Sequence, residues 1–239
     1  MTTAFFLLLQ ITSAQAAPLT GEEVLARMHE RWNGKWFKTM TFIQETRFPG
    51  RPVQIWYETI EAPGRLRIDF GPIDSMNTAI IKNDSVYQYR RGTLRGARPY
   101  PNTLGVVLSD VYAQPVSKTV DYLRKAGFDL GKVRTESWQG HPVWVIGAAA
   151  GDSTTPQLWI DQSRLVLDRI VEKMPNGATM LGEILGRETG AIPVENDLRF
   201  YENGVEVQRE VYTQITLNPV IDPDVFDTGD WKKPSWVTK

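Results

Sequence analysis

The residues from Thr39 to Phe70 constrain the fold most, because they read as three short strands joined by two tight turns. Valine, isoleucine, threonine and aromatic residues fill the three runs, and a Pro-Gly pair stands in each connection. Side chains of a strand alternate between its two faces, so Leu66, Ile68 and Phe70 form an apolar row on one face. A sheet with one apolar face must bury that face against other elements. The segment therefore predicts an antiparallel meander that needs a cover.

A helix is predicted immediately before this meander. Thr20 and Glu23 form a capping box at its start, and Gly34 supplies the stop at its end. Another helix is expected from Ser117, which we expect to be its N-cap, to Ala126. Both helices carry their apolar residues on one side, as helices that cover a sheet do.

The stretch from Thr103 to Gln114 predicts a further helix, which Pro115 stops. Its apolar residues recur at the spacing of one helix face and are Leu104, Val107, Leu108 and Val111. Val106 and Tyr112 extend the apolar surface beyond that stripe. Such a helix is either a lid that can part from the sheet or an element buried on both sides.

The rest of the chain predicts ten more strands separated by turn residues. They are expected at residues 78–82, 85–89, 93–98, 133–138, 141–148, 157–161, 165–173, 179–185, 197–201 and 205–217. Asn-Gly pairs mark two of the turns, which indicates hairpins. The fold class is therefore mainly β (α+β), with a curved antiparallel sheet and about three helices on its concave side. The tail from Asp222 to Lys239 is expected to be a loosely packed strap.

The first sixteen residues form an apolar run that ends in Ala14-Gln15-Ala16. This pattern is typical of a secretory signal peptide cleaved near Ala16, and the alternative is a short buried helix. The remainder, 17–239, is predicted to be a single domain. It contains no run of eighteen apolar residues, so we expect no transmembrane segment in the mature chain.

Composition excludes several functions. The chain has no cysteine, which rules out disulfides, thiolate metal sites and cysteine nucleophiles. A formal net charge of −1 with interspersed charges argues against a nucleic-acid surface. The only histidines, His29 and His141, lack paired metal-ligand spacing and are expected at the surface, so no metal site is predicted. No phosphate-binding loop or nucleophile elbow occurs, and we expect no cofactor.

Two other functions remain open at this point. Carboxylates on the predicted strands, among them Glu45, Glu58, Glu61 and Asp69, could form the acid and nucleophile of an exported carbohydrate hydrolase. Alternatively, an exposed sheet edge could bind a partner in an envelope-assembly module.

If the helices plug the curved sheet incompletely, an apolar ligand cavity remains between them. The candidate lining residues on the strands are Phe42, Trp56, Ile60, Leu66, Ile68, Phe70, Tyr87 and Tyr89. The candidates on the covering helix are Leu104, Val107, Leu108 and Val111. Core packing would use the same residue types, so the sequence does not separate a cavity from a filled core.

The order of these features resembles the periplasmic outer-membrane lipoprotein-sorting family, the LolA/LolB-like proteins. The features that carry the resemblance are the signal segment, the helix T-G-E-E-V-L-A-R-M-H-E-R-W, the strand T-F-I-Q-E-T, the segment E-A-P-G-R-L-R-I-D-F, the hairpin N-D-S-V-Y-Q-Y, two inserted helices, the strand Q-L-W-I-D and the closing N-P-V-I-D-P-D-V-F-D. They span nearly the whole mature chain.

The resemblance implies an unclosed β-barrel with a helical lid, and a non-enzymatic periplasmic carrier of lipoprotein acyl chains or lipid. It also implies an inner-membrane release complex and an outer-membrane acceptor as partners. Family carriers have an arginine before the proline of the second turn, where this chain has Ala62. The resemblance therefore leaves Arg65 and Arg67, just beyond that turn, as candidates for lid control.

Overall fold

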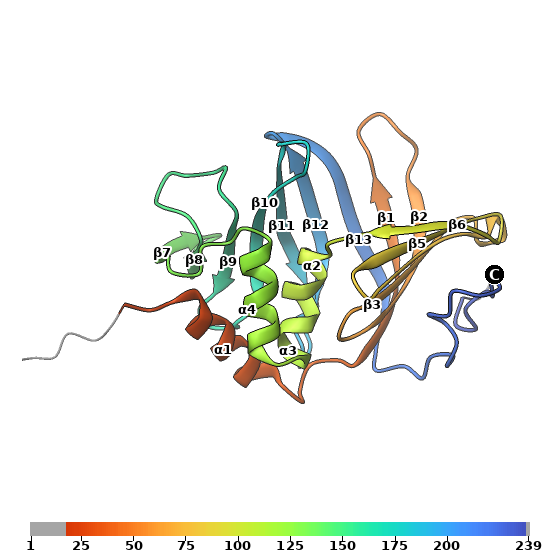
Figure 1. The fold of residues 1–239 in the computed structure, drawn as a ribbon, viewed down its shortest axis with the longest axis horizontal. Helices are drawn as coiled ribbons and strands as arrows, with labels where there is room; N and C mark the ends of the chain where they lie inside the picture. Colours follow the sequence, from red (N-terminus) through yellow and green to blue (C-terminus); the bar gives the residue numbers. More distant parts are fainter. Residues whose placement is uncertain (1–17, 238–239) are drawn as a thin grey trace, which may run out of the picture.

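The computed structural model describes residues 18–237, so the predicted signal segment 1–16 lies outside the described residues. One antiparallel sheet of 13 strands dominates the molecule (Figure 1). The strands are β1 (Thr39–Arg47), β2 (Gln54–Glu61), β3 (Arg65–Phe70), β4 (Asn77–Lys82), β5 (Ser85–Arg90), β6 (Thr93–Pro99), β7 (Val133–Trp138), β8 (His141–Ile146), β9 (Gln157–Asp161), β10 (Leu167–Lys173), β11 (Thr179–Arg187), β12 (Glu195–Glu202) and β13 (Val205–Leu217). Each predicted strand is present, with small shifts at its ends.

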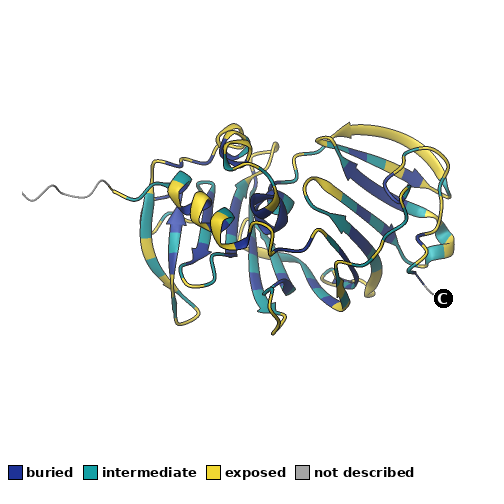
Figure 2. Cartoon of the chain, turned by 90° about the horizontal axis from the view of Figure 1, so that it is seen from below, coloured by how far each residue is buried: buried dark blue, intermediate teal, exposed yellow. Residues whose placement is uncertain are grey.

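The strand order shows why the barrel stays open. It runs β6-β5-β4-β3-β2-β1-β13-β12-β11-β10-β9-β8-β7, so the first and last strands of the chain pair at the centre of the sheet. The register there places Gln44 opposite Tyr212 and Thr46 opposite Glu210. The two edges are β6 and β7. They are consecutive strands in the sequence, separated by the inserted helices, and they do not pair with each other. Figure 2 shows β6 exposed along its length. The predicted fold class is confirmed.

The helices lie on one face of the sheet, which we call the inner face (Figure 1). The first, α1 (Gly21–Trp32), begins with the predicted capping box between Thr20 and Glu23. The inserted segment forms α2 (Thr103–Gly105), the π-helical turn η2 (Val106–Asp110), α3 (Val111–Ala113) and α4 (Val116–Lys125). We call α2, η2 and α3 together, residues 103–113, the cover helix. A short 3₁₀ turn, η1 (Ile73–Ser75), follows β3.

Ser117 is not the cap of α4, contrary to our prediction. The helix begins one residue earlier, at Val116, and its N-cap is Pro115, which has no side-chain cap. Proline fixes its own backbone angle near the value that leads into a helix, so the turn can start without a capping hydroxyl. Ser117 therefore lies inside the first turn.

The cover helix is buried on more than one side. Val107 and Val111 are fully buried, and Tyr112 is 1% exposed. They belong to the main core, which also contains residues of α1, α4 and the strands β8 to β12. The His29 ring nitrogen Nδ1 lies 3.0 Å from the Val111 carbonyl oxygen, which ties the cover helix to α1. His29 is thus half-buried rather than a surface histidine.

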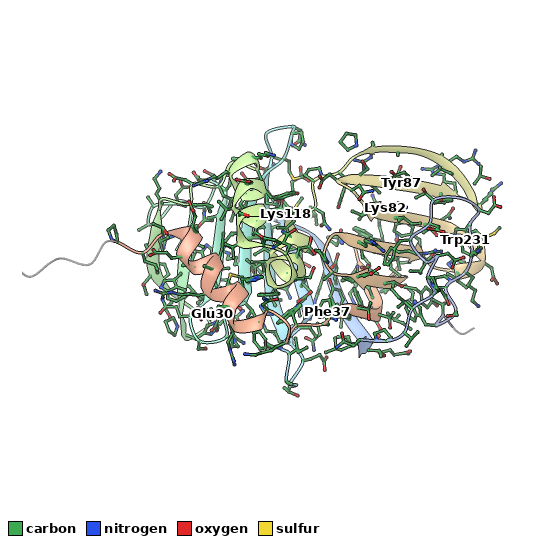
Figure 3. The ribbon with its side chains drawn as sticks, turned by 60° about the horizontal axis from the view of Figure 1, so that its bottom comes forward. Glu30, Phe37, Lys82, Tyr87, Lys118 and Trp231 are labelled. Atoms are coloured by element: carbon green, nitrogen blue, oxygen red, sulfur yellow. The ribbon has the colours of Figure 1, made fainter. Side chains whose placement is uncertain are left out.

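The outer face of β2 to β5 is covered by the C-terminal strap, which we define as residues 218–237. Val225 and Phe226 of the strap are buried against Ile80 and Tyr89. Figure 3 shows Trp231 of the strap near Lys82 and Tyr87. The strap is therefore well packed, although it contains no helix or strand, and the prediction of a loose tail was wrong.

A buried ion pair anchors this strap. Arg67 binds Asp69 through two hydrogen bonds, Nε to Oδ2 at 2.7 Å and Nη2 to Oδ1 at 2.9 Å. The same guanidinium donates to the Val225 carbonyl oxygen at 2.9 Å and the Lys232 carbonyl oxygen at 2.6 Å. Trp236 adds a bond from Nε1 to the Thr59 hydroxyl at 2.9 Å. The strap is thus fixed by charge as well as by apolar packing.

Candidate functional site

A cavity of about 370 Å³ lies between the inner face of the sheet and the cover helix. Its apolar lining comes from Phe37, Phe42, Trp56, Ile60, Leu66, Ile68, Phe70, Ala79, Ile81, Val86, Leu104 and Leu108. Figure 3 places Phe37 between the helices and the strands. Pockets that hold small molecules have volumes of about 300–1,000 Å³ and mainly apolar walls, so this cavity is of ligand size.

The alternation of each strand explains this wall. Trp56 and Ile60 point inward from β2, and Leu66, Ile68 and Phe70 point inward from β3. The register pairs Leu66 with Ile60 and Phe70 with Trp56 across the two strands. The predicted apolar row on Leu66, Ile68 and Phe70 therefore becomes one side of the cavity, and the cover helix lies over it.

Eight of the twelve predicted lining residues meet at this cavity. They are Phe42, Trp56, Ile60, Leu66, Ile68, Phe70, Leu104 and Leu108. Val107 and Val111 point to the opposite side of the cover helix, into the main core. The side of the cover helix that faces the cavity carries Gly105 and Ser109 beside Leu104 and Leu108, so its facing side is shifted from the predicted apolar stripe.

Tyr87 and Tyr89 lie on the outer face of β5, so they do not line the cavity. Tyr89 is buried under the strap and donates to the Gly229 carbonyl oxygen at 3.2 Å. Tyr87 packs against the same cluster, with the Lys82 ammonium 5.7 Å from its ring centre. Val86 and Gln88 are the residues of β5 that face inward. Our prediction read the wrong face of this strand.

One end of the cavity is acidic, which the prediction missed. Glu58, Glu195 and Glu210 line it from β2, β12 and β13 and are 5%, 4% and 9% exposed. Gln208 donates to the Glu210 carboxylate, and the Tyr212 hydroxyl donates to it at 2.9 Å. In residues 18–237 no hydrogen bond or ion pair reaches the Glu58 carboxyl group. The sequence offered one signal of it: Glu58 alternates with the apolar residues Trp56 and Ile60, which predicts that it shares their inward face.

Burial raises the pKa of all three glutamates. The pKa of Glu58 lies well above its usual value because the carboxyl is desolvated and because the charge of Glu210 is close by. Desolvation also raises the pKa of Glu210, against the hydrogen bonds from Tyr212 and Gln208. The pKa of Glu195 rises to about 7 for the same reason, although the nearby Arg187 opposes the shift. The acidic end therefore favours bound protons or a cation.

The cover helix contacts the sheet through Asp110. Its carboxylate accepts from the Gly64 backbone N–H at 2.9 Å and from the Ser109 hydroxyl at 3.1 Å. Gly64 lies in the turn between β2 and β3, with a φ of +83° that favours glycine. Burial raises the pKa of Asp110 despite these bonds. The turn that carries Ala62 thus holds the cover helix by a backbone donor.

Arg65 and Arg67 lie away from the cover helix, on the outer face. Arg65 pairs with Glu61 at 2.8 Å and is largely exposed. Arg67 is buried against Asp69 and the strap. Neither arginine therefore occupies a position from which it bonds the cover helix.

A larger and more open hollow, about 1,040 Å³, adjoins the cavity at the end of β3 to β5. Phe70 and Gln88 line both spaces. The hollow has a mixed lining that includes Met76 and three exposed arginines, Arg90, Arg91 and Arg95. The two spaces therefore meet at Phe70 and Gln88.

A histidine and two aspartates also approach one another on the β8 to β10 side. His141 Nε2 lies 2.9 Å from Asp168 and 3.4 Å from Asp161, so His141 is not a simple surface histidine. Arg164 lies 2.6 Å from Asp161, and Arg187 lies 3.2 Å from Asp168. The two guanidinium groups supply the positive charge that a metal ion would bring, and the cluster is an ion-pair network.

The fold and the cavity define an open antiparallel half-barrel with an internal, ligand-sized space beneath a helix. Solved structures share this architecture. A domain assigned to outer membrane lipoprotein sorting from Vibrio parahaemolyticus superposes with a TM-score of 0.57 at 11% identity, over 87% of this chain and 96% of the other. A LolA superfamily protein from Nitrosomonas europaea gives 0.51 at 11% identity, over 88% and 99%. A DUF1329 family protein from Desulfovibrio piger gives 0.56 at 11% identity, over 87% and 96%.

The chain therefore has the LolA-like fold that the resemblance predicted. An identity of 11% shows the fold and does not transfer a ligand. No family model matches the chain, and no curated protein matches it. None of the helices in residues 18–237 has the length and apolarity that crossing a membrane requires.

Proposed function

We propose that this protein is a non-enzymatic periplasmic carrier or binding protein for the acyl chains of lipoproteins or lipids, and that it takes part in outer-membrane lipoprotein sorting. The observation that carries the proposal is the cavity of about 370 Å³ beneath the cover helix, with apolar side chains from β2 to β5 along its wall. Burying an acyl chain contributes about 0.8 kcal/mol per methylene, so an apolar wall supplies affinity without a polar site.

Export and partners form part of the same proposal. The apolar segment that ends at Ala16 supports secretion into the periplasm. A carrier in that compartment would receive its cargo from an inner-membrane release complex and deliver it to an outer-membrane acceptor. The open hollow beside the cavity supports a route for the cargo, because Phe70 and Gln88 border both spaces.

The hydrolase alternative loses most of its residues in the structure. Glu45, Glu61 and Asp69 each pair with an arginine, at 2.8, 2.8 and 2.7 Å, on the face away from the cavity. Of the four carboxylates considered, only Glu58 faces the cavity. A glycosidase needs two carboxyl groups that flank the same bond, so none of the other three can serve as its partner.

The closing contact also differs from the predicted one. The hydrogen bond between Asp110 and the Gly64 N–H joins the cover helix to the sheet beside the cavity. Val107 and Val111 hold the other side of this helix in the core. We therefore assign the closing contact to Asp110 instead of Arg65 or Arg67. We propose that the cover helix separates from the sheet only on the side that faces the cavity.

Filling the cavity should remove binding. We expect Ile68→Trp to weaken binding of lauroyl glycerol, a neutral single-chain lipid, by about tenfold or more, because the indole occupies space needed by the chain. Isothermal titration below the micelle concentration measures this. Ile55→Trp is the matched control, since Ile55 is 36% exposed on the other face of the neighbouring strand. Equal affinities of the two variants, or no binding by the unaltered protein, would contradict the proposal.

A further inference from the structure

We propose that Glu58, Glu195 and Glu210 form a subsite for the primary ammonium group of a single-chain amphiphile whose chain lies along the apolar wall of the cavity. The inference deepens the proposed carrier function and rests on it. It adds the chemistry of the head group, since the carrier function itself needs only an apolar chain.

The unpartnered carboxyl of Glu58 is the first observation. The side chain is 95% buried, faces the cavity, and receives no hydrogen bond from residues 18–237. Buried polar groups in folded proteins are nearly always hydrogen-bonded, because leaving one unpaired costs about 1–3 kcal/mol. The oxygens of Glu58 keep contact with the cavity space, so their partner comes from what occupies that space, water or a ligand.

The charge around Glu58 is the second observation. Glu210 is close enough for its charge to raise the pKa of Glu58, and Glu195 lies on the next strand along from β13. Among the described residues no lysine or arginine forms an ion pair with any of the three. Like charges that share a buried site are stabilised by a proton or by a cation from outside.

The arginines that come nearest are occupied elsewhere. Arg187 faces Glu195, but its guanidinium pairs with Asp168 and donates to two backbone carbonyls. Arg98 lines the cavity from the edge strand β6, with β3, β4 and β5 between it and Glu58. Its guanidinium lies 5.8 Å from the ring centre of Tyr100, which also lines the cavity, and it forms no ion pair with the three glutamates. Within residues 18–237, none of the three glutamates is therefore neutralised by an ion pair.

An ammonium group fits this end better than a metal ion. The three carboxyl groups are not among the residues whose ligand atoms converge on one point; only His141, Asp161 and Asp168 do so within residues 18–237. An ammonium group needs no such convergence, because one of its donors can bind Glu58 while the charges of Glu195 and Glu210 attract it from farther away. Its attached chain would continue along Trp56, Ile60 and Ile68, which line the adjoining wall. The cavity therefore matches a ligand with one cationic end and one apolar body.

The test compares three ligands with the same chain and different heads. Isothermal titration of the full mature chain near neutral pH uses dodecylamine, dodecanol and dodecanoate, each below its micelle concentration. We expect dodecylamine to bind about tenfold more tightly than dodecanol, because the ammonium gains charge-assisted hydrogen bonds, and dodecanoate to bind most weakly. Dodecylamine binding should also release about one proton, seen as a heat that depends on the buffer, because Glu58 gives up its proton to pair with the ammonium.

Glu58→Gln and Glu210→Gln should each reduce the preference for dodecylamine over dodecanol to about threefold or less. Both variants are measured so that the test still stands if one of them fails to fold. Glu45→Gln is the matched control on the outer face, where Glu45 pairs with Arg47, and it should keep the full preference. Equal affinities for the three ligands in the unaltered protein would overturn the subsite and leave the carrier function standing. Binding of none of them would overturn both.

Discussion

At the scale of single residues, Glu195 links the cavity to the pH dependence of folding. Its pKa rises from 4.5 to about 7 because the carboxyl is desolvated. Between these two values the folded chain binds more protons than the unfolded chain, so the free energy of unfolding falls as pH rises. The contribution of Glu195 is complete below about pH 4.5 and is lost by about pH 7.

We therefore expect the protein to be less stable at pH 8 than at pH 5, by about 3 kcal/mol for Glu195 alone. Glu58 and Glu210 act in the same direction, since burial raises their pKa values too. Urea unfolding at a series of pH values measures this. Glu195→Gln should flatten the profile, whereas the exposed Glu188→Gln should not. A profile that rises from pH 5 to 8 would contradict the assignment.

Sequence reasoning at this scale found the apolar wall and missed the acidic end. The apolar row of Leu66, Ile68 and Phe70 could be predicted because alternation within one strand is a local sequence pattern. Glu58, Glu195 and Glu210 meet only because β1 pairs with both β2 and β13, which are far apart in sequence. Tyr87 and Tyr89 were placed inward because nothing in the sequence of β5 says which of its faces the strap covers.

At the scale of elements, the strap is the part of the chain whose role changed most. It has no regular structure, yet it buries the outer face of β2 to β5 through Val225 and Phe226. The ion pair of Arg67 and Asp69 anchors the strap to β3, and both side chains are almost completely buried. The sheet therefore carries apolar side chains on both faces here, against the cavity and against the strap.

Removing the buried charge should release the strap. Arg67→Met leaves Asp69 as an unpaired buried carboxylate and removes two bonds to strap carbonyls, so we expect a loss of about 3–5 kcal/mol in the free energy of unfolding. Arg65→Met, on the same strand face, removes an exposed pair with Glu61 and should cost about 1 kcal/mol or less. Chemical denaturation measures both. Similar losses in the two variants would show that the ion pair does not anchor the strap.

Elements with local signals were predicted well. The thirteen strands follow from turn residues and β-rich runs, and α1 follows from its capping box. The cover helix was placed correctly but its π-helical turn was not, because the periodicity of four apolar residues does not distinguish a regular helix from one with a widened turn. The packing of the strap depends on partners in β3 to β5 and has no local pattern.

At the scale of the whole molecule, the open sheet explains why a cavity remains on its inner face. The pairing of β1 with β13 at the centre leaves β6 and β7 as free edges, and the helices between them cover only part of the inner face. The cavity of about 370 Å³ lies where the cover helix does not fill the space above the inner face. The order of motifs predicted this architecture through the family resemblance, whereas local patterns alone allowed a closed barrel or a sandwich.

The most direct test of the carrier account is native mass spectrometry of the protein purified without detergent from the periplasm of its host. We predict a population with the mass of the chain plus a bound lipid or acylated cargo, present in the unaltered protein and in Ile55→Trp but lost in Ile68→Trp. The mass of the bare chain alone in all three samples, under conditions that preserve non-covalent complexes, would contradict the account.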